Sequence, residues 1–149
     1  MDTSLVESFS LDHTKVIAPF VRLAGRYEGP KGDVISKFDL RFLQPNKGAI
    51  PTSAMHTLEH LLAIYFRKEI DNVIDVSPMG CRTGFYFLCF GEAKPVIVMN
   101  ALEKVLKKVI STKEIPAANA IQCGNYLDHS LSGAIEYAKI ALEGLRVLE

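Results

Sequence analysis

The stretch at residues 53–62 reads Ser53-Ala54-Met55-His56-Thr57-Leu58-Glu59-His60-Leu61-Leu62. An α-helix completes a turn in about 3.6 residues, so this spacing places two imidazoles and a carboxylate on one stripe. His56 and His60 can then bind one cation while Glu59 stands beside it. Ala63 ends the stripe and leaves room for a ligand. The rest of the chain is expected to fold around this helix.

Local signals set the expected bounds of the helix. Pro51 precedes the hydroxyl side chains of Thr52 and Ser53, which is typical of a helix start with a side-chain cap. The residues from Leu58 onward are apolar on nearly all sides, which indicates a buried helix. We expect about four turns, ending at Glu69.

The pattern His-x-x-Glu-His is the reverse of the common zinc-protease motif and indicates a metal site. The alternative is that the two imidazoles are only solvated or bonded to backbone carbonyl groups. Cys123, beside Gly124 in a predicted loop, is the expected third ligand, because two imidazoles and a thiolate suit Zn²⁺ or Fe²⁺ better than Mg²⁺ or Ca²⁺. A fourth protein ligand is not expected, since His13 and His129 lack a suitable local setting. Three ligands leave the open position of a catalytic site.

Composition limits the class of protein. The chain has 149 residues, 48% of them apolar, which predicts one domain covering residues 1–149. It shows no membrane-spanning stretch and no signal peptide, so we expect a cytoplasmic protein. Seventeen basic residues balance seventeen acidic ones, which disfavours a nucleic-acid or membrane surface and favours a small ligand. The three cysteines form no Cys-x-x-Cys pair and suit a reducing compartment.

Alternating patterns predict two β-hairpins separated by the metal helix. The strands are expected at residues 20–27, 34–43, 73–76 and 85–90. A helix should begin near Pro95, and a last helix should follow a cap at Asp128 or Ser130, with Leu131, Ile135, Ala138, Leu142 and Leu145 as its apolar stripe. This order favours an α+β fold in which helices cover one face of an antiparallel sheet.

The remaining candidate residues have less distinctive surroundings. Cys81 lies in a glycine-rich loop and is expected to be reactive, whereas Cys89 lies in an apolar strand and is expected to be an inert core residue. From position alone, Ser8 and His13 suggest a loosely held N-terminal arm, and Arg41 suggests a solvent-facing charge.

A resemblance changes that interpretation. Motifs along nearly the whole chain resemble the LuxS family of S-ribosylhomocysteine lyases: Val6-Glu7-Ser8-Phe9, Leu11-Asp12-His13, Lys37-Phe38-Asp39-Leu40-Arg41-Phe42, Gln44-Pro45-Asn46, His56-Thr57-Leu58-Glu59-His60, Ser77-Pro78-Met79-Gly80-Cys81 and Gln122-Cys123-Gly124. The resemblance implies a metallohydrolase-like α+β domain that forms a cytoplasmic homodimer with active sites at the interface. It also implies cleavage of S-ribosylhomocysteine to homocysteine and 4,5-dihydroxy-2,3-pentanedione, the precursor of the quorum-sensing signal autoinducer-2.

The family resemblance assigns a role to each candidate residue. It implies one Fe²⁺ per subunit, replaceable by Zn²⁺ or Co²⁺. It makes His56, His60 and Cys123 the metal ligands, Glu59 and Cys81 the acid/base pair, and Ser8, His13, Arg41 and Asp75 substrate-binding residues.

Two other classes of protein remain open at this point. The first is a small metallopeptidase in which Glu59 activates a metal-bound water, although such enzymes use a downstream glutamate and are larger. The second is a non-catalytic interaction module whose metal has a closed shell of four protein ligands.

Overall fold

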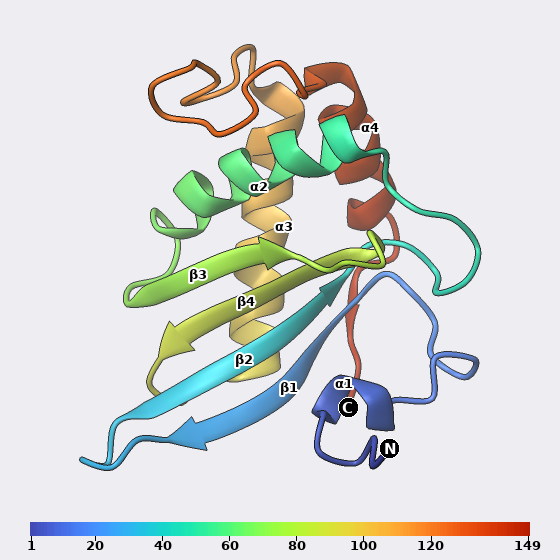
Figure 1. Ribbon diagram of the computed structural model, residues 1–149, viewed down its shortest axis with the longest axis vertical. Coiled ribbons are helices and arrows are strands. Elements are labelled where there is room, and N and C mark those ends of the chain that lie inside the picture. Colours follow the sequence, from blue (N-terminus) through green and yellow to red (C-terminus); the bar gives the residue numbers. More distant parts are fainter.

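The computed structural model describes residues 1–149 and contains a five-stranded sheet with the strand order β3-β4-β2-β1-β5 (Figure 1). The strands are β1 (Phe20–Glu28), β2 (Val34–Arg41), β3 (Val73–Pro78), β4 (Gly84–Phe90) and β5 (Arg146–Val147). The two predicted hairpins pair antiparallel and join through β2 and β4. The sheet is mixed rather than wholly antiparallel, because the short β5 runs parallel to β1. A two-residue strand has too short a pattern to be predicted from sequence.

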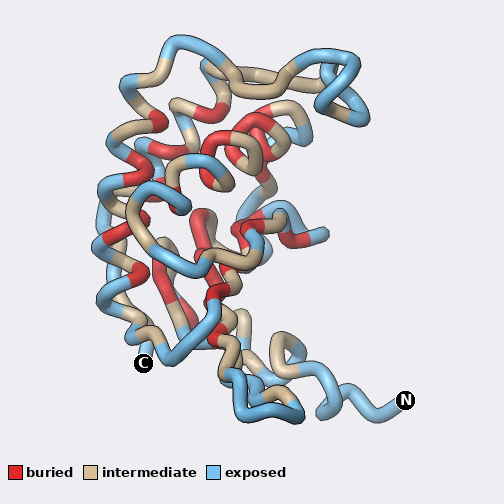
Figure 2. The backbone as a smooth tube through the Cα atoms, turned by 90° about the vertical axis from the view of Figure 1, so that its left-hand side faces the viewer, coloured by how far each residue is buried: buried red, intermediate tan, exposed pale blue.

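Three helices cover one face of the sheet: α2 (Thr52–Phe66), α3 (Pro95–Ser111) and α4 (Leu131–Leu142). The buried segments gather where these helices face the strands (Figure 2). Phe38, Leu40, Phe85 and Phe87 point from β2 and β4 into this core and are fully buried. The predicted α+β class is confirmed. No helix combines the length and the hydropathy needed to cross a bilayer.

The opposite face of the sheet is partly covered by a short helix, α1 (Glu7–Ser10). It lies in the stretch for which the sequence predicts a loosely held N-terminal arm. Glu7 pairs with Arg22 of β1, and Arg22 reaches Asp39 of β2 across the strands. Asp39 and Arg41 are 0% and 2% exposed, so the prediction of a solvent-facing Arg41 from strand alternation is wrong. Alternation identifies the face on which a side chain lies, but it does not reveal what packs there.

Helix α2 is shorter than predicted and has a different start. It ends at Phe66 rather than Glu69, and turns carry the chain from there to Ile70. Its N-cap is Pro51, and no side chain caps the helix, so the predicted hydroxyl cap is absent. Near this start, Ser53 O also accepts from the backbone N–H of Ser130 at 3.1 Å. The contact ties the start of α2 to the start of α4.

The predicted cap of α4 is confirmed at Ser130, whose hydroxyl accepts from Gly133 N at 3.1 Å. The buried face of α4 consists of Ala134, Ala138 and Ala141, with Leu131 and Leu142 only partly buried, so the predicted leucine stripe is shifted. Small side chains allow close packing: a Cβ at Gly133 would lie 2.9 Å from the Cβ of Ala54 in α2. This close approach brings the residues before α4 against the metal helix.

Candidate metal centre

Four possible ligand atoms converge beside α2. His56 and His60 lie one turn apart, with ring centroids separated by 4.8 Å and planes at 86°. The loop between α3 and α4 runs along α2 (orange in Figure 1) and places Cys123 Sγ 3.4 Å from His56 Nε2. His129 Nε2 lies 3.7 Å from the same sulfur. One atom from each of these four residues fits within a group whose members are at most 4.8 Å apart.

Backbone contacts orient the two imidazoles of α2. His56 Nδ1 lies 2.9 Å from the carbonyl oxygen of Asp128, and His60 Nδ1 lies 2.8 Å from that of Pro116. A carbonyl oxygen only accepts, so each Nδ1 carries the hydrogen and each Nε2 keeps its lone pair for a cation. Bonding to backbone carbonyl groups, the alternative to a metal site, accounts for the Nδ1 atoms. It does not account for the Nε2 atoms, which converge on the Cys123 thiol.

Thr57 fixes the third imidazole. Its hydroxyl donates to Ser53 O at 3.0 Å and accepts from Ser130 N at 2.9 Å. Since that hydroxyl has only one hydrogen, His129 Nδ1, which lies 3.0 Å away, must donate to it. His129 therefore also presents an unprotonated Nε2 to the cluster. Burial, and then the neighbouring His56 and His60 imidazoles, lower the pKa of His129, which favours this neutral form.

His129 is thus a fourth possible donor beside the three expected ligands. From the sequence, His129 is rejected as a ligand for want of a suitable local setting, although it stands six residues after Cys123 and directly before the Ser130 cap. Its ring stacks on His56, with centroids 4.0 Å apart and planes tilted by only 21°. An imidazole donates through a lone pair in the plane of its own ring, and these two stacked rings hold their lone pairs in separate, nearly parallel planes. The geometry favours three donors with His129 packed beside them, rather than the closed shell of an interaction module.

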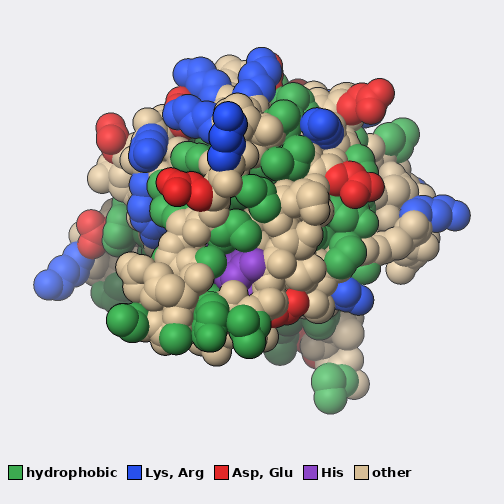
Figure 3. Space-filling view, turned by 90° about the horizontal axis from the view of Figure 1, so that it is seen from above, with side chains coloured by type: hydrophobic (Ala, Val, Ile, Leu, Met, Phe, Trp, Pro, Cys, Tyr) green, Lys and Arg blue, Asp and Glu red, His purple; other side chains and the backbone are tan.

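Glu59 and Asp75 open onto the same cavity as His60. The cavity, of about 330 Å³, is also lined by Arg67, whose guanidinium donates to Ile74 O at 3.0 Å. Asp75 is exposed between two less exposed neighbours. Seen from above, histidine lies in a hollow bordered by hydrophobic side chains (Figure 3). A small polar ligand can therefore reach this side of the cluster.

The second group of predicted site residues surrounds Cys81. His13 and Arg41 line two adjoining cavities with it, of about 340 and 260 Å³, and Ser8 lines the smaller one. Cys81 is exposed, whereas Cys89 is 1% exposed and burial raises the pKa of its thiol. The predicted core position of Cys89 is confirmed, and the reactivity of the exposed Cys81 stays a prediction.

The two groups remain separate within one chain. The cavity beside Glu59, His60 and Asp75 shares no lining residue with the cavities beside Cys81. The structure thus brings together all the predicted site residues in two sets, but it does not join the sets into one cavity.

Comparison with known proteins identifies the family of this chain. The family model described as S-Ribosylhomocysteinase (LuxS) matches residues 6–148. The chain belongs to the LuxS family. It is 59% identical over 138 residues to an S-ribosylhomocysteine lyase of Clostridioides difficile, with 93% of this chain and 91% of that protein covered. It is 55% identical over 150 residues to an S-ribosylhomocysteine lyase of Deinococcus radiodurans, covering 99% and 95%. The LuxS family match disfavours the metallopeptidase alternative.

Proposed function

We propose that this chain is a metal-dependent carbon–sulfur lyase that cleaves S-ribosylhomocysteine to homocysteine and 4,5-dihydroxy-2,3-pentanedione. The single observation that carries the proposal is the LuxS match over residues 6–148, because the relatives it joins are named for this substrate. The diketone is the precursor of autoinducer-2, so the same reaction supplies a quorum-sensing signal and returns homocysteine to the activated methyl cycle.

His56, His60 and Cys123 are the residues that would hold the cation, one per subunit. The convergence of two Nε2 lone pairs on a sulfur supports this choice. Imidazole and thiolate ligands suit Fe²⁺, with Zn²⁺ or Co²⁺ as substitutes, better than a hard cation. When bound, such a cation would polarise a sugar carbonyl group and stabilise negative charge that develops on its oxygen.

Glu59 and Cys81 are proposed to share the proton transfers. Moving the carbonyl group from the first to the third carbon of the ribose takes two steps, and in each a proton leaves the carbon beside the carbonyl group and a proton is added to the former carbonyl carbon. Removal of the acidified proton on the fourth carbon then expels the homocysteine thiolate from the fifth. Glu59 lies beside the metal ligand His60 in one cavity, and Cys81 lies in another, so they can serve opposite sides of a bound sugar.

Four further residues are proposed to bind substrate. Asp75 lines the cavity on the metal side, where its carboxylate can accept from sugar hydroxyl groups. Ser8, His13 and Arg41 line the cavities on the thiol side, where a cation and polar groups can orient the amino-acid end of the substrate. These roles follow from the family resemblance and agree with the places of the four side chains.

We propose that the working unit is a cytoplasmic homodimer with sites at the interface. A second chain could join the two sets of site residues that a single chain keeps apart. Hydrophobic side chains are exposed beside both sets: Phe9 on the N-terminal arm is 66% exposed, and Leu127 near the metal residues is 80% exposed. Three unpaired cysteines suit the reducing cytoplasm.

The direct test is release of a free thiol from S-ribosylhomocysteine by purified, metal-loaded protein. Stoichiometric homocysteine and the diketone are the expected products, detected by a thiol reagent and by trapping with a diamine. Protein that binds metal but releases no thiol, while cleaving a peptide substrate, would replace this proposal with the metallopeptidase.

A further inference from the structure

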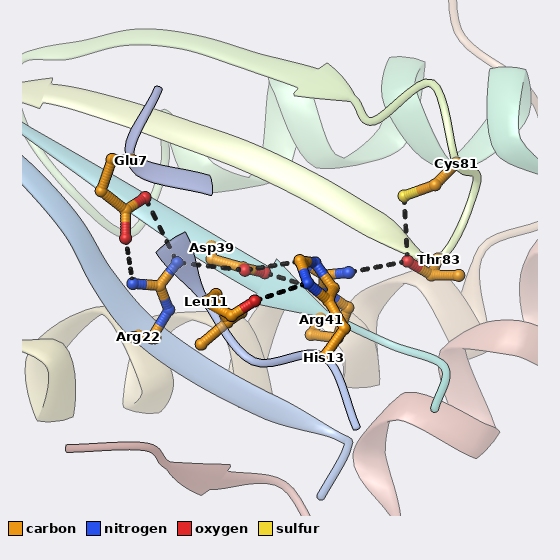
Figure 4. Close-up of polar contacts among 8 residues, drawn as sticks. All are labelled: Glu7, Leu11, His13, Arg22, Asp39, Arg41, Cys81 and Thr83. Carbon is orange, nitrogen blue, oxygen red and sulfur yellow. Dashed lines mark hydrogen bonds and ion pairs between the residues drawn. The ribbon is translucent and has the colours of Figure 1, made fainter. Parts of the chain in front are cut away.

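We propose that Thr83 is a positioning residue for Cys81. Its hydroxyl group accepts a hydrogen bond from the buried Arg41 guanidinium, is polarised by that charge, and donates to the Cys81 sulfur, which stabilises the thiolate. The inference deepens the proposed function, on which the acid/base role of Cys81 rests. Figure 4 shows the contacts that lead from the N-terminal helix through Asp39, Arg41 and Thr83 to Cys81.

The donor and acceptor roles around Thr83 follow from the chemistry of its two neighbours. Arg41 Nη1 lies 3.0 Å from Thr83 Oγ1, and a guanidinium group can only donate, so the hydroxyl oxygen accepts this bond. Cys81 Sγ lies 3.1 Å from the same oxygen. The hydroxyl hydrogen remains free to point at the sulfur. A hydroxyl that accepts from a cation is polarised, and the bond it donates is strongest when the acceptor is a thiolate.

Thr83 is held rigidly enough to act in this way. It is 4% exposed, and its carbonyl oxygen accepts from the backbone N–H groups of Phe42 at 2.9 Å and Leu43 at 3.0 Å. The next residue must be glycine, because a Cβ at Gly84 would lie 2.3 Å from Leu40 O. This close approach of β4 to β2 sets Thr83 beside Arg41.

The loop that carries Cys81 is also closed on itself. Met79 N donates to Gly84 O at 3.0 Å, and Arg82 N donates to Met79 O at 2.9 Å. Arg82 adopts a positive φ of 57°, which bends the chain between the thiol and Thr83. The sulfur therefore meets the hydroxyl through a short, restrained loop rather than through chance contact of mobile side chains.

Arg41 is itself fixed by a run of charged groups. Its Nε and Nη2 atoms donate to the two carboxylate oxygens of Asp39, at 3.1 and 2.7 Å. Arg22 lies 3.6 Å from Asp39 and pairs with Glu7. Since Asp39 and Arg41 are buried, their orientation is costly to change. The third guanidinium nitrogen, Nη1, is thereby directed at Thr83.

The test is the rate at which iodoacetamide alkylates Cys81, read site by site by mass spectrometry in the metal-loaded protein. At about pH 7, Thr83→Val should lower the fraction of Cys81 present as thiolate about tenfold. Each remaining thiolate is a stronger nucleophile because it is less stabilised, so the observed rate of alkylation should fall only about threefold. Thr83→Ser restores the hydroxyl and should stay within about twofold of wild type. The ultraviolet absorbance of the thiolate should fall in Thr83→Val and return in Thr83→Ser.

The direction of the change separates positioning from a structural role. A substitution that only loosens the loop would make the already exposed Cys81 more accessible and would not slow its alkylation. Ser77→Ala is the matched control, because it removes a hydroxyl from β3 that donates to Asp75 and not to Cys81, and its alkylation rate should not change. Thr83→Ala provides a second hydroxyl-free variant in case the valine variant does not fold.

Unchanged or faster alkylation in folded Thr83→Val or Thr83→Ala, with unchanged thiolate absorbance, would overturn the inference. Alkylation needs no substrate, so this outcome is distinct from failure of the proposed lyase reaction. A protein that shows the slowed alkylation but releases no thiol from S-ribosylhomocysteine would support the role of Thr83 and contradict the proposed function.

Discussion

At the scale of single residues, the role of Glu59 can be tested separately from metal binding. It stands between the proposed ligands His56 and His60 in the sequence, but its carboxylate is not among the four clustered donors. Glu59→Gln preserves the shape of the side chain and removes its ability to accept a proton. Metal content should stay near wild type while thiol release falls by about 10²-fold or more. Glu114→Gln, at an exposed position outside both cavities, is the matched control. Wild-type turnover in Glu59→Gln would make this carboxylate structural.

The three cysteines should give three different responses to alanine. Cys123→Ala should empty the metal site, because one of three protein ligands is lost. Cys81→Ala should keep the metal and lose turnover by about 10²-fold or more. Cys89→Ala should lower stability by ~1 kcal/mol, the cost of a small cavity, and leave turnover per bound metal unchanged. Metal analysis, thiol release and thermal unfolding distinguish the variants. Metal lost from Cys81→Ala and kept in Cys123→Ala would reverse the two roles.

His129 tests whether proximity to the cluster means coordination. Its ring stacks on His56 with centroids 4.0 Å apart, so the lone pairs of the two rings lie in separate, nearly parallel planes. We expect His129→Ala to weaken metal binding by about tenfold, since a packing neighbour of a ligand is lost, and not to empty the site. Competition with a chelator measures this affinity. A loss as large as that of Cys123→Ala would show that His129 is a fourth ligand.

At the scale of elements, Glu69 joins the end of the metal helix to α3. Its carboxylate pairs with Lys108 and lies 3.5 Å from Lys104. The hydrogen bond from Lys108 lowers the pKa of Glu69, and the charge of Lys104 adds to the effect. A carboxyl group whose pKa is lowered in the folded state stabilises the fold above its ordinary pKa of 4.5, and this stabilisation is lost as the pH falls below that value.

Glu69→Gln should therefore lower the melting temperature at about pH 7, and lower it much less at an acid pH below the lowered pKa of Glu69, where the wild-type carboxyl group is protonated as well. Thermal unfolding at the two pH values measures the difference. Glu114→Gln removes a carboxylate that makes no ion pair and should show no such dependence. An equal loss of stability at both pH values would mean that Glu69 acts through packing and not through charge.

The same element scale shows where sequence patterns are sufficient. Periods of two and 3.6 residues predict the two hairpins, α3 and the core position of Cys89, because these features depend on neighbours along the chain. Sequence patterns predict the bounds of α2 and the apolar stripe of α4 less accurately. Their end points depend on contacts such as Gly133 against Ala54, which lie 79 positions apart by residue number.

At the scale of the whole molecule, the two separated sets of site residues predict that activity needs two chains. Chains with His13→Ala and chains with Glu59→Gln should each be inactive alone, because each variant lacks one essential side chain from one of the two sets of site residues. After mixing and refolding, about half of the dimers should be mixed, with one intact site in each, which restores about a quarter of wild-type activity. His13 suits the test better than Arg41, whose loss would leave the buried Asp39 carboxylate with only Arg22, 3.6 Å away, as an ionic partner. Absence of any recovery, or a fully active monomer in sedimentation, would place the whole site within one chain.

The sequence by itself determined the features that short spacing controls. It placed His56, Glu59 and His60 on one helix, put Cys81 in an accessible loop and Cys89 in a strand core, and resembled the LuxS family through motifs along the chain. Only the tertiary structure decided that His129 stacks on His56, that Arg41 is buried with Asp39 beneath the N-terminal arm, and that Thr83 links Arg41 to Cys81. The physical reason is range: helical and strand periodicity acts over a few residues, whereas these contacts join segments up to 73 positions apart by residue number and depend on how loops and elements pack.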